Sequence, residues 1–436
     1  MRYLIGYSVA SSNLQLVPGK MEADLYIAGL LESIKNTKDT QIFDIGVGGS
    51  ILGDPVVHEN VVYFGACDKN FYAVSLKDGK EIWSFVAGDV IGNVSLEGST
   101  LYFGSFDKNV YALSLSGGLL WKFSSGGKII AKPAVHEGAI YVGASDGCLY
   151  ALSATSGRLM WKFNTYRPII TDVLVHKDTI YLGSYDGILY ALTLDGRVKW
   201  KFNAKSFVGS PVVHQDRIFF ASFDRHLYCL DMAGKMLWSF RSDGILTSRP
   251  LAVHDNLVFP ASRNGYLYAV TVDGKLMWKF KVGEEIFVRP SVGQCLYFGS
   301  ADYTFYCVDF SGKEKWRFQT RGPIASSSYL HDDKVIFGSW DCNLYCLDTE
   351  GKLLWRFPTK LSHMAPVNVE SKPETITALE VTWKPEELRQ EERYRNRAQE
   401  AVGLSQYGDF NTGYVTKGAG YISMDNKDYL GKKRKK

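Results

Sequence analysis

The sequence lacks any long apolar run. No stretch approaches the roughly 18 consecutive apolar residues that a membrane-spanning helix requires, so a transmembrane segment is not expected. The first residues, MRYLIGYSVASSNLQLVPG, also lack an extended apolar segment followed by a small-residue cleavage site, which makes them a poor signal peptide. These absences predict a cytoplasmic protein, or a nuclear one if the chain is eukaryotic.

Paired cysteine motifs are absent as well. The chain contains seven cysteines but no CxxC and no CxxCH, which excludes a zinc knuckle and covalently attached haem. Cys148, Cys229 and Cys346 stand within apolar runs, where small buried side chains are expected. We therefore predict no metal and no cofactor.

Charge of one sign is scarce. The net charge is +4, and residues 384–436, with 12 Lys and Arg against 8 Asp and Glu, account for all of it. The rest of the chain is close to neutral, which argues against a surface that coats nucleic acid. Nucleic acid is expected, if anywhere, only at the basic C-terminal end.

What the sequence does contain is a repeat with a period of about 39 residues, which is typical of a repeat architecture. Eight tryptophans recur at steps of 38 to 40 residues: Trp83, Trp121, Trp161, Trp200, Trp238, Trp278, Trp316 and Trp355. Each repeat holds four short apolar runs, as in IIAKPAV, IYVGAS, LYALSA and LMWKF between residues 129 and 163. Such runs predict four β-strands, which we call A, B, C and D in chain order.

Turn residues separate these runs at fixed places. The B–C turn carries residues that tolerate positive φ, namely Asp68, Asp107, Asp146, Asp186, Asp224, Asn264, Asp302 and Asp341. The C–D turn carries Gly79, Gly118, Gly157, Gly196, Gly234, Gly274, Gly312 and Gly351. A four-stranded unit of this size buries its faces only against its neighbours, and radial repetition of such sheets is a β-propeller. Each tryptophan is expected to fill the gap to the adjacent blade.

The repeat resembles a known family. The segments IYVGASDGCLYALSATSGRLMWKF (140–163) and IYLGSYDGILYALTLDGRVKWKF (180–202) are similar to the pyrroloquinoline-quinone-type propeller repeat, and the similarity covers about residues 41–360. That family includes quinoprotein alcohol dehydrogenases and the propeller lipoprotein of bacterial outer-membrane assembly. The dehydrogenases use long insertions between blades, a neighbouring cysteine pair and a metal cluster of Glu, Asn and Asp, none of which can be mapped onto this chain. The resemblance therefore implies an all-β propeller that is a non-catalytic member.

Eight complete A–D units are predicted, which implies eight blades. Residues 41–45 resemble an extra D strand, residues 363–369 an extra A strand and residues 2–9 a B strand, so a ninth blade built from both termini is the alternative. We favour eight, because nine-bladed rings are rare. The predicted organisation is an N-terminal extension (1–40), the propeller (41–370), a linker and charged helix (371–404) and a tail (405–436). Residues 21–36 of the extension are expected to form a short helix, and a C-type strand is the alternative because LYIAGL resembles LYALSL.

Candidate binding residues lie where the A strands converge on the central axis. In several repeats a proline stands near the start of the A strand, and the residue before that position in each repeat gives a ring of mixed charge: Asp54, Asn93, Lys132, Asp172, Ser210, Arg249, Arg289 and Ser327. Such a ring could hold a polar ligand or a partner, and the alternative is a water-filled channel satisfied by its own ion pairs. No catalytic residue is predicted.

A second group of candidates lies in the C-terminal tail. This segment is rich in Gly, Asn and Ser, carries the spaced aromatics Tyr407, Phe410, Tyr414, Tyr421 and Tyr429, and ends in a run of five Lys and Arg. Such a composition does not make its own core, so the tail is expected to be disordered or to dock on a partner.

Six histidines follow strand A at one repeat position: His58, His136, His176, His214, His254 and His331. Equivalent positions on successive blades lie far apart around a ring, so these residues are interpreted as turn residues and not as metal ligands. The sequence predicts a scaffold that binds other proteins. The alternatives are a sensor that holds a small ligand in the channel and a quinone-dependent oxidoreductase.

Overall fold

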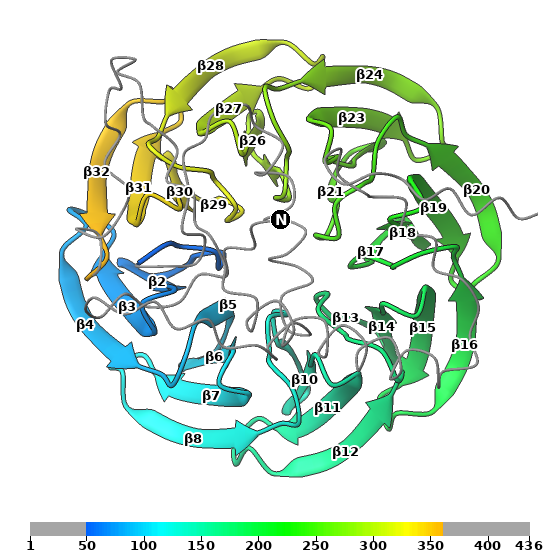
Figure 1. The fold of residues 1–436 in the computed structure, drawn as a ribbon, viewed down its shortest axis with the longest axis horizontal. Coiled ribbons are helices and arrows are strands. Elements are labelled where there is room, and N and C mark those ends of the chain that lie inside the picture. The colour runs from blue at the N-terminus through cyan, green and yellow to red at the C-terminus, as the bar shows by residue number, and fades with distance from the viewer. Residues whose placement is uncertain (1–48, 361–436) are drawn as a thin grey trace, which may run out of the picture. The chain divides into compact units, whose positions relative to one another are not determined.

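The computed structural model describes residues 49–360, which form eight four-stranded antiparallel sheets. Each sheet is built from four consecutive strands, A innermost and D outermost, and the sheets are arranged as blades around a common axis (Figure 1). No helix occurs between residues 49 and 360. The predicted all-β propeller with eight blades is therefore confirmed.

The inner two strands are short in seven of the eight blades, and blade 2, where they have 7 and 6 residues, is the exception. The A strands of blades 1 to 8 are β1 (Val56–His58), β5 (Ile91–Glu97), β9 (Ala134–His136), β13 (Leu174–His176), β17 (Val212–His214), β21 (Ala252–His254), β25 (Ser291–Val292) and β29 (Tyr329–His331). The B strands are β2 (Val61–Gly65), β6 (Thr100–Ser105), β10 (Ala139–Gly143), β14 (Thr179–Gly183), β18 (Arg217–Ala221), β22 (Leu257–Phe259), β26 (Leu296–Gly299) and β30 (Lys334–Gly338). Strand β22 stops at Phe259 because Pro260 has no N–H to give to the ladder.

The outer two strands are longer and more uniform. The C strands are β3 (Asn70–Ser75), β7 (Asn109–Ser114), β11 (Cys148–Ser153), β15 (Ile188–Thr193), β19 (His226–Asp231), β23 (Tyr266–Thr271), β27 (Thr304–Val308) and β31 (Asn343–Asp348). The D strands are β4 (Glu81–Val86), β8 (Leu119–Ser124), β12 (Leu159–Asn164), β16 (Val198–Asn203), β20 (Met236–Arg241), β24 (Leu276–Lys281), β28 (Glu314–Gln319) and β32 (Leu353–Pro358).

Burial follows the position of a strand in its blade. The B and C strands are buried on both faces and read as continuous apolar runs, because a neighbouring blade covers each face. The D strands alternate instead, so that in β12 Trp161 and Phe163 are half-buried while Met160 and Lys162 face solvent. The core is accordingly a set of layers between blades, with the D strands forming the rim.

A tryptophan and a glycine join each pair of neighbouring blades. The indole Nε1 of Trp121 in blade 2 donates to the carbonyl of Ala154 in blade 3 over 2.9 Å. A Cβ on Gly157, which has a φ of +67°, would lie 2.5 Å from the Trp121 ring. The turn therefore needs glycine both for its backbone and for the close approach of the ring. The predicted role of the tryptophans is confirmed.

The ring closes in the same way between its last and first blades. Trp355 of blade 8 donates to the carbonyl of Leu76 in blade 1 over 2.9 Å and packs on Gly79. The ends of the described chain also meet, because the Thr359 hydroxyl donates to the carbonyl of Gly49 over 2.9 Å. Blades 8 and 1 contact each other directly, so the alternative of a composite ninth blade is wrong.

Two details of the predicted turns are corrected. In blade 2 the residue that packs on the preceding tryptophan is Gly117, with a φ of +86°, and not Gly118. In the B–C turns the positive φ falls on the residue after the aspartate, such as Lys69, Lys108 or Gly147. The aspartates themselves act as hydrogen-bond acceptors for their own turn and for the preceding blade. The strands predicted at 2–9, 41–45 and 363–369, both predicted helices and the tail lie outside the described residues.

Candidate functional site

The eight hub residues sit where the blades converge, and most of them bind the next blade. The backbone amide of Lys132 donates to Asp172 Oδ1 over 2.8 Å, and the amide of Asp172 donates to Ser210 Oγ over 2.9 Å. Other links around the ring run from Asp54 N to Asn93 Oδ1, from Arg289 N to Ser327 Oγ and from Ser327 N to Asp54 Oδ1. The polar side chains predicted to line the channel thus serve as acceptors for backbone donors of the neighbouring blade.

Arg249 behaves differently, because it reaches across the hub. Its guanidinium lies 3.8 Å from the Asp54 carboxylate and donates to the carbonyl of Leu52 over 3.4 Å, so it links blade 6 to blade 1. The Arg249 side chain is only 9% exposed. A buried charge requires such compensation, and the ion pair with Asp54 provides part of it.

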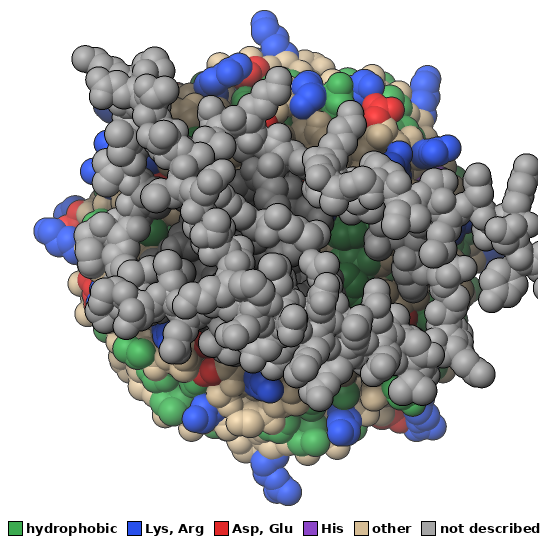
Figure 2. Space-filling view, viewed as in Figure 1, with side chains coloured by type: hydrophobic (Ala, Val, Ile, Leu, Met, Phe, Trp, Pro, Cys, Tyr) green, Lys and Arg blue, Asp and Glu red, His purple; other side chains and the backbone are tan. Residues whose placement is uncertain are grey.

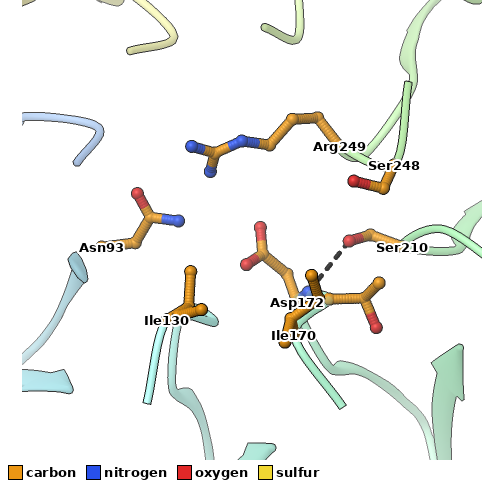
Figure 3. Close-up of a pocket in the computed structure, with 8 residues that line it drawn as sticks. Asn93, Ile130, Ile170, Asp172, Ser210, Ser248 and Arg249 are labelled. Atoms are coloured by element: carbon orange, nitrogen blue, oxygen red, sulfur yellow. Dashed lines mark hydrogen bonds between the residues drawn. The ribbon is translucent and has the colours of Figure 1, made fainter. Parts of the chain in front are cut away.

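The space enclosed at the hub is small. Asn93, Asp172 and Arg249 point toward one another from different blades, with Ser210 and Ser248 beside them (Figure 3). The cavity they line has a volume of about 10 Å³, which is close to the room of a single water molecule. Sites for small organic ligands usually enclose about 300–1,000 Å³. The cavity between these residues is therefore too small for a cofactor or a metabolite.

A redox quinone can be tested against the same residues. At the hub, Arg249 and Asp54 form an ion pair with each other, and the cavity beside Arg249 is only about 10 Å³. Within residues 49–360, no group of three or more His, Cys, Asp and Glu side chains could hold a metal ion. The described residues do not fit a quinone with its metal.

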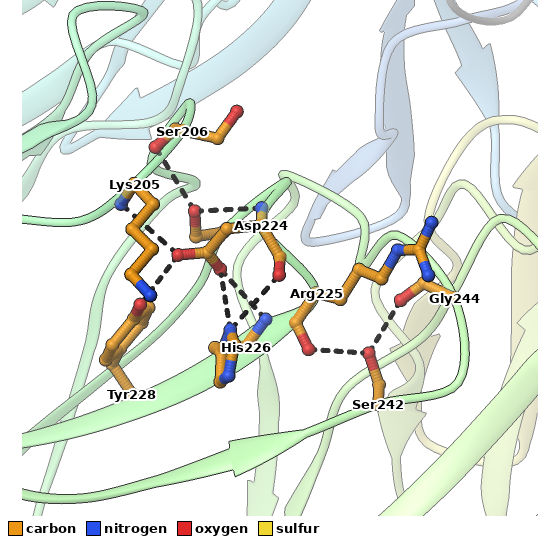
Figure 4. A network of polar contacts seen from close by, with 9 residues as sticks. Lys205, Ser206, Asp224, Arg225, His226, Tyr228, Ser242 and Gly244 are labelled. Atoms are coloured by element: carbon orange, nitrogen blue, oxygen red, sulfur yellow. Dashed lines mark hydrogen bonds and ion pairs between the residues drawn. The ribbon is translucent and has the colours of Figure 1, made fainter. Parts of the chain in front are cut away.

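The B–C turn aspartates form contacts that sequence reasoning missed. Asp224 accepts the backbone N–H of His226 over 3.0 Å and the hydroxyl of Tyr228 over 2.6 Å within blade 5. It also accepts the amide of Lys205 from blade 4 over 3.2 Å (Figure 4). The aspartate therefore closes its own turn and holds the preceding blade. The regular Asp-x-x-x-Tyr spacing is the signal in the sequence that could have revealed this.

The C-strand tyrosines that donate to the B–C turn aspartates have raised pKa values. Burial raises the pKa of Tyr111 to about 12, and its hydrogen bond to Asp107 acts in the same direction. The pKa of Tyr306 is raised to about 12 for the same two reasons, with Asp302 as its partner. Both phenols donate to the aspartate of their own B–C turn.

Each of the six histidines is the last residue of an A strand, and they lie on six different blades. They are distributed around the ring, but the interpretation as turn residues is wrong, because each pairs within its sheet and the turn begins at the next residue. The tail candidates Tyr407, Phe410, Tyr414, Tyr421 and Tyr429 lie outside the described residues. Their docking role stays a prediction.

Known proteins share both the sequence pattern and the fold. A family model described as outer membrane protein assembly factor BamB matches residues 17–114, 106–219 and 224–365, which is well over half of the chain. The chain belongs to the BamB family. The eight-bladed ring and the pyrroloquinoline-quinone-type repeat predicted from the sequence are thereby confirmed at the level of the family.

Solved structures support the same fold. The crystal structure of BamB from Moraxella catarrhalis is 20% identical, with a TM-score of 0.57 over 69% of this chain and 92% of that one. The computationally designed Ika8 protein is 15% identical, with a TM-score of 0.62 over 69% of this chain and 98% of that one. At such identities the likeness concerns the fold. A search of curated proteins gave no match.

Proposed function

We propose that this BamB-family propeller is a non-catalytic scaffold that binds other proteins. The observation that carries the proposal is the hub, where Arg249 pairs with Asp54 and the cavity between Asn93, Asp172 and Arg249 has a volume of only about 10 Å³. With so small a cavity among these hub residues, the outer surfaces are what the ring offers to other molecules. The fold alone does not identify the partner, which the surface chemistry must select.

The C-terminal tail is proposed as a second docking element. Its aromatics at Tyr407, Phe410, Tyr414, Tyr421 and Tyr429 are spaced by Gly, Asn and Ser, and it ends in a basic run. Aromatic side chains bury large area at low entropic cost, which suits anchors on an extended segment. The basic end would favour an acidic surface on the partner.

Affinity purification of the full chain and of a chain that ends at residue 383 tests both parts of this proposal. We expect a defined set of proteins to copurify with the full chain and part of that set to be lost from the truncated one. An unchanged set would contradict the docking role of the tail. Absence of any copurifying protein from both chains would contradict the scaffold itself.

The two alternatives make different predictions. A small-ligand sensor would show ligand-dependent melting, and an oxidoreductase would copurify with a cofactor chromophore. The size of the hub cavity argues against both for the residues that line it. We therefore retain the scaffold as the proposed function.

The cytoplasm is the proposed location of the protein. No helix of the described part has the length and apolar character to cross a bilayer. The seven cysteines are all buried free thiols, which suits a reducing compartment and supports the cytoplasm as the proposed location. Microscopy of the tagged chain would test this, and a nuclear signal would favour the alternative.

A further inference from the structure

The basic residues of the rim are distributed unevenly around the ring. In blades 2, 3 and 4 the D strand and the loop that follows it, residues 117–131, 157–171 and 196–209, contain no Asp or Glu. The same segments carry Lys122, Lys128, Arg158, Lys162, Arg167, Arg197, Lys199, Lys201 and Lys205. We call these nine residues the basic sector. A near-neutral chain thus concentrates one sign of charge on three consecutive blades.

Four of the five other blades carry acids in the corresponding segment. Blade 8 has none in residues 351–360, but it is a single blade beside the acids of blade 1, and its Lys360 lies 3.7 Å from Glu81. Blade 1 has Glu81 and Asp89, blade 5 has Asp243, and blade 6 has Glu284 and Glu285. Some of these acids neutralise their neighbours, since Lys279 of blade 6 lies 2.7 Å from Asp243. Edge strands need some positive charge to prevent pairing with other chains, but that need is equal for all eight blades. It does not explain why acids are missing from three consecutive blades.

Much of the charge in the basic sector is available to a partner. Lys122, Arg158, Lys162 and Arg167 are exposed and form no ion pair with any residue between 49 and 360. Arg197 is the exception, because it pairs with Asp195. The nearby Asp146 is already engaged by Tyr150 and by the amide of Cys148. The four unpaired cations outnumber this carboxylate and can attract an anionic partner.

Exposed apolar side chains stand among these cations. Leu120 is 55% exposed on β8 and Met160 is 58% exposed on β12. Tyr166, in the loop after β12, is 84% exposed and has a φ of +63°, which is uncommon for an aromatic residue. Basic side chains project beyond hydrophobic patches along the lower rim in Figure 2, where Figure 1 places β8 and β12.

The backbone of Tyr166 is fixed in this unusual conformation. Asn164 Oδ1 accepts the Tyr166 amide over 2.6 Å, which holds the loop immediately after the strand. The equivalent positions in blades 1, 2 and 6 are Gly88, Gly126 and Gly283. Blade 3 thus presents a large aromatic side chain at a place where other blades have none. Strained residues that present a side chain to solvent are frequently functional.

We propose that the basic sector, with Met160 and Tyr166 as apolar anchors, binds an acidic segment of a partner protein that also carries aromatic or apolar side chains. Nucleic acid is charge-complementary too, but binding to phosphates gains nothing from exposed Met160 and Leu120. A protein segment with both acidic and apolar side chains satisfies both features of the surface. This inference rests on the proposed scaffold function and names the surface that performs it.

The test measures binding of the full chain to a fluorescent random copolymer of Glu and Tyr, with poly-Glu of equal length as comparison. We expect tighter binding to the copolymer, and about tenfold weaker binding by the double variant Lys162→Glu with Arg167→Glu. The matched control is Arg356→Glu with Arg321→Glu, which changes the charge equally in blades 8 and 7 and should stay within about twofold of the wild type. Equal losses in both variants would overturn the proposal.

The role of Met160 as an apolar anchor can be tested with Met277 as a matched control. Met160 and Met277 are both methionines directly before the blade tryptophan and are 58% and 56% exposed. Met160→Gln should weaken binding of the Glu–Tyr copolymer and leave poly-Glu binding unchanged, whereas Met277→Gln should change neither. Tighter binding of a single-stranded oligonucleotide of equal charge, or of phosphatidylserine vesicles, would overturn the assignment to a protein segment.

Failure of this inference can be told apart from failure of the scaffold function. If proteins copurify equally with the wild type and with the Lys162→Glu and Arg167→Glu variant, the scaffold stands and the basic sector is not its surface. Loss of those partners from the sector variant alone, with unchanged thermal melting, supports the inference. All variants lie on exposed side chains, so their folds can be compared directly by circular dichroism.

Discussion

At the scale of single residues, Arg249 is the exception in a ring built from contacts between neighbours. Its guanidinium spans from blade 6 to Asp54 of blade 1, and that same carboxylate accepts the amide of Ser327 from blade 8. Three blades therefore meet at one carboxylate. The pair stabilises the ring only as a pair, since removal of one partner leaves the other charge poorly compensated.

Replacement of Arg249 by Met should lower the free energy of unfolding by about 1–3 kcal/mol, a reduced figure because the Asp54 side chain is 26% exposed. Asp54→Asn keeps an acceptor for the Ser327 amide and should cost less. The double variant should recover part of the loss, with a coupling of about 1 kcal/mol in urea titrations. Strictly additive effects would show that the ion pair contributes nothing.

At the scale of the elements, each C–D turn and each D strand form a unit with the neighbouring blade. A glycine with positive φ lets the turn approach the indole, and the indole N–H is satisfied by a carbonyl of the same turn. The positive φ of the turn and the closeness of the indole ring thus both require glycine at the same position. This double requirement explains why the glycine recurs with the tryptophan in all eight repeats.

The two requirements can be separated by experiment. Gly138 has a φ of +76° but nothing within 4 Å of a built Cβ, whereas a Cβ on Gly157 would lie 2.5 Å from Trp121. Gly138→Ala should therefore cost about 1 kcal/mol for the backbone alone. Gly157→Ala should cost about 2–4 kcal/mol because the ring must move as well. Equal melting temperatures for the two variants would contradict the close contact.

The tyrosines of the C strands predict a dependence on alkaline pH. The pKa of Tyr111 and that of Tyr306 are raised to about 12 in the folded ring, mainly by burial, while an unfolded tyrosine titrates near pH 10. The stability that these phenols contribute is complete below pH 10 and is lost as pH rises toward 12. Urea unfolding at pH 9, 10.5 and 11.5, with absorbance at 295 nm, should show this fall. A flat profile would show that the phenols ionise equally in both states.

At the scale of the whole molecule, the ring closes without sharing a blade between its ends. Blade 8 contains β29 to β32 and blade 1 contains β1 to β4, so their seam depends on side-chain and backbone contacts alone. The other seven seams also have a covalent linker that holds the two blades together. The last seam is therefore the one most able to open.

Trp355→Ala should open this seam locally. We expect hydrogen exchange to accelerate in both terminal blades, because Trp355 binds Leu76 and packs on Gly79. Trp161→Ala, at an internal seam, should lower global stability by about 3 kcal/mol without a comparable local opening. Similar exchange patterns for the two variants would show that the covalent linker adds nothing.

The sequence was sufficient for the repeat, the blade count and the place of the tryptophans, because each depends on periodicity and apolar pattern. The hub illustrates where such reasoning stops. The ring positions could be aligned, but the crossing of Arg249 to Asp54 joins residues 195 positions apart and has no local signal. The dual role of Asp224 was also missed, since a turn preference alone already accounted for an aspartate there.

Adjacency of Gly49 and Thr359 has a topological consequence. Since every blade is one uninterrupted stretch of chain, the order of the blades around the axis does not depend on which blade is translated first. A circular permutant whose old ends are joined and whose new ends lie between β16 and β17 should reach the same ring. A tandem duplication of the gene, followed by loss of sequence from both ends, would therefore move the start of the chain from one blade to another. The duplicated chain would still contain eight consecutive blades at every stage.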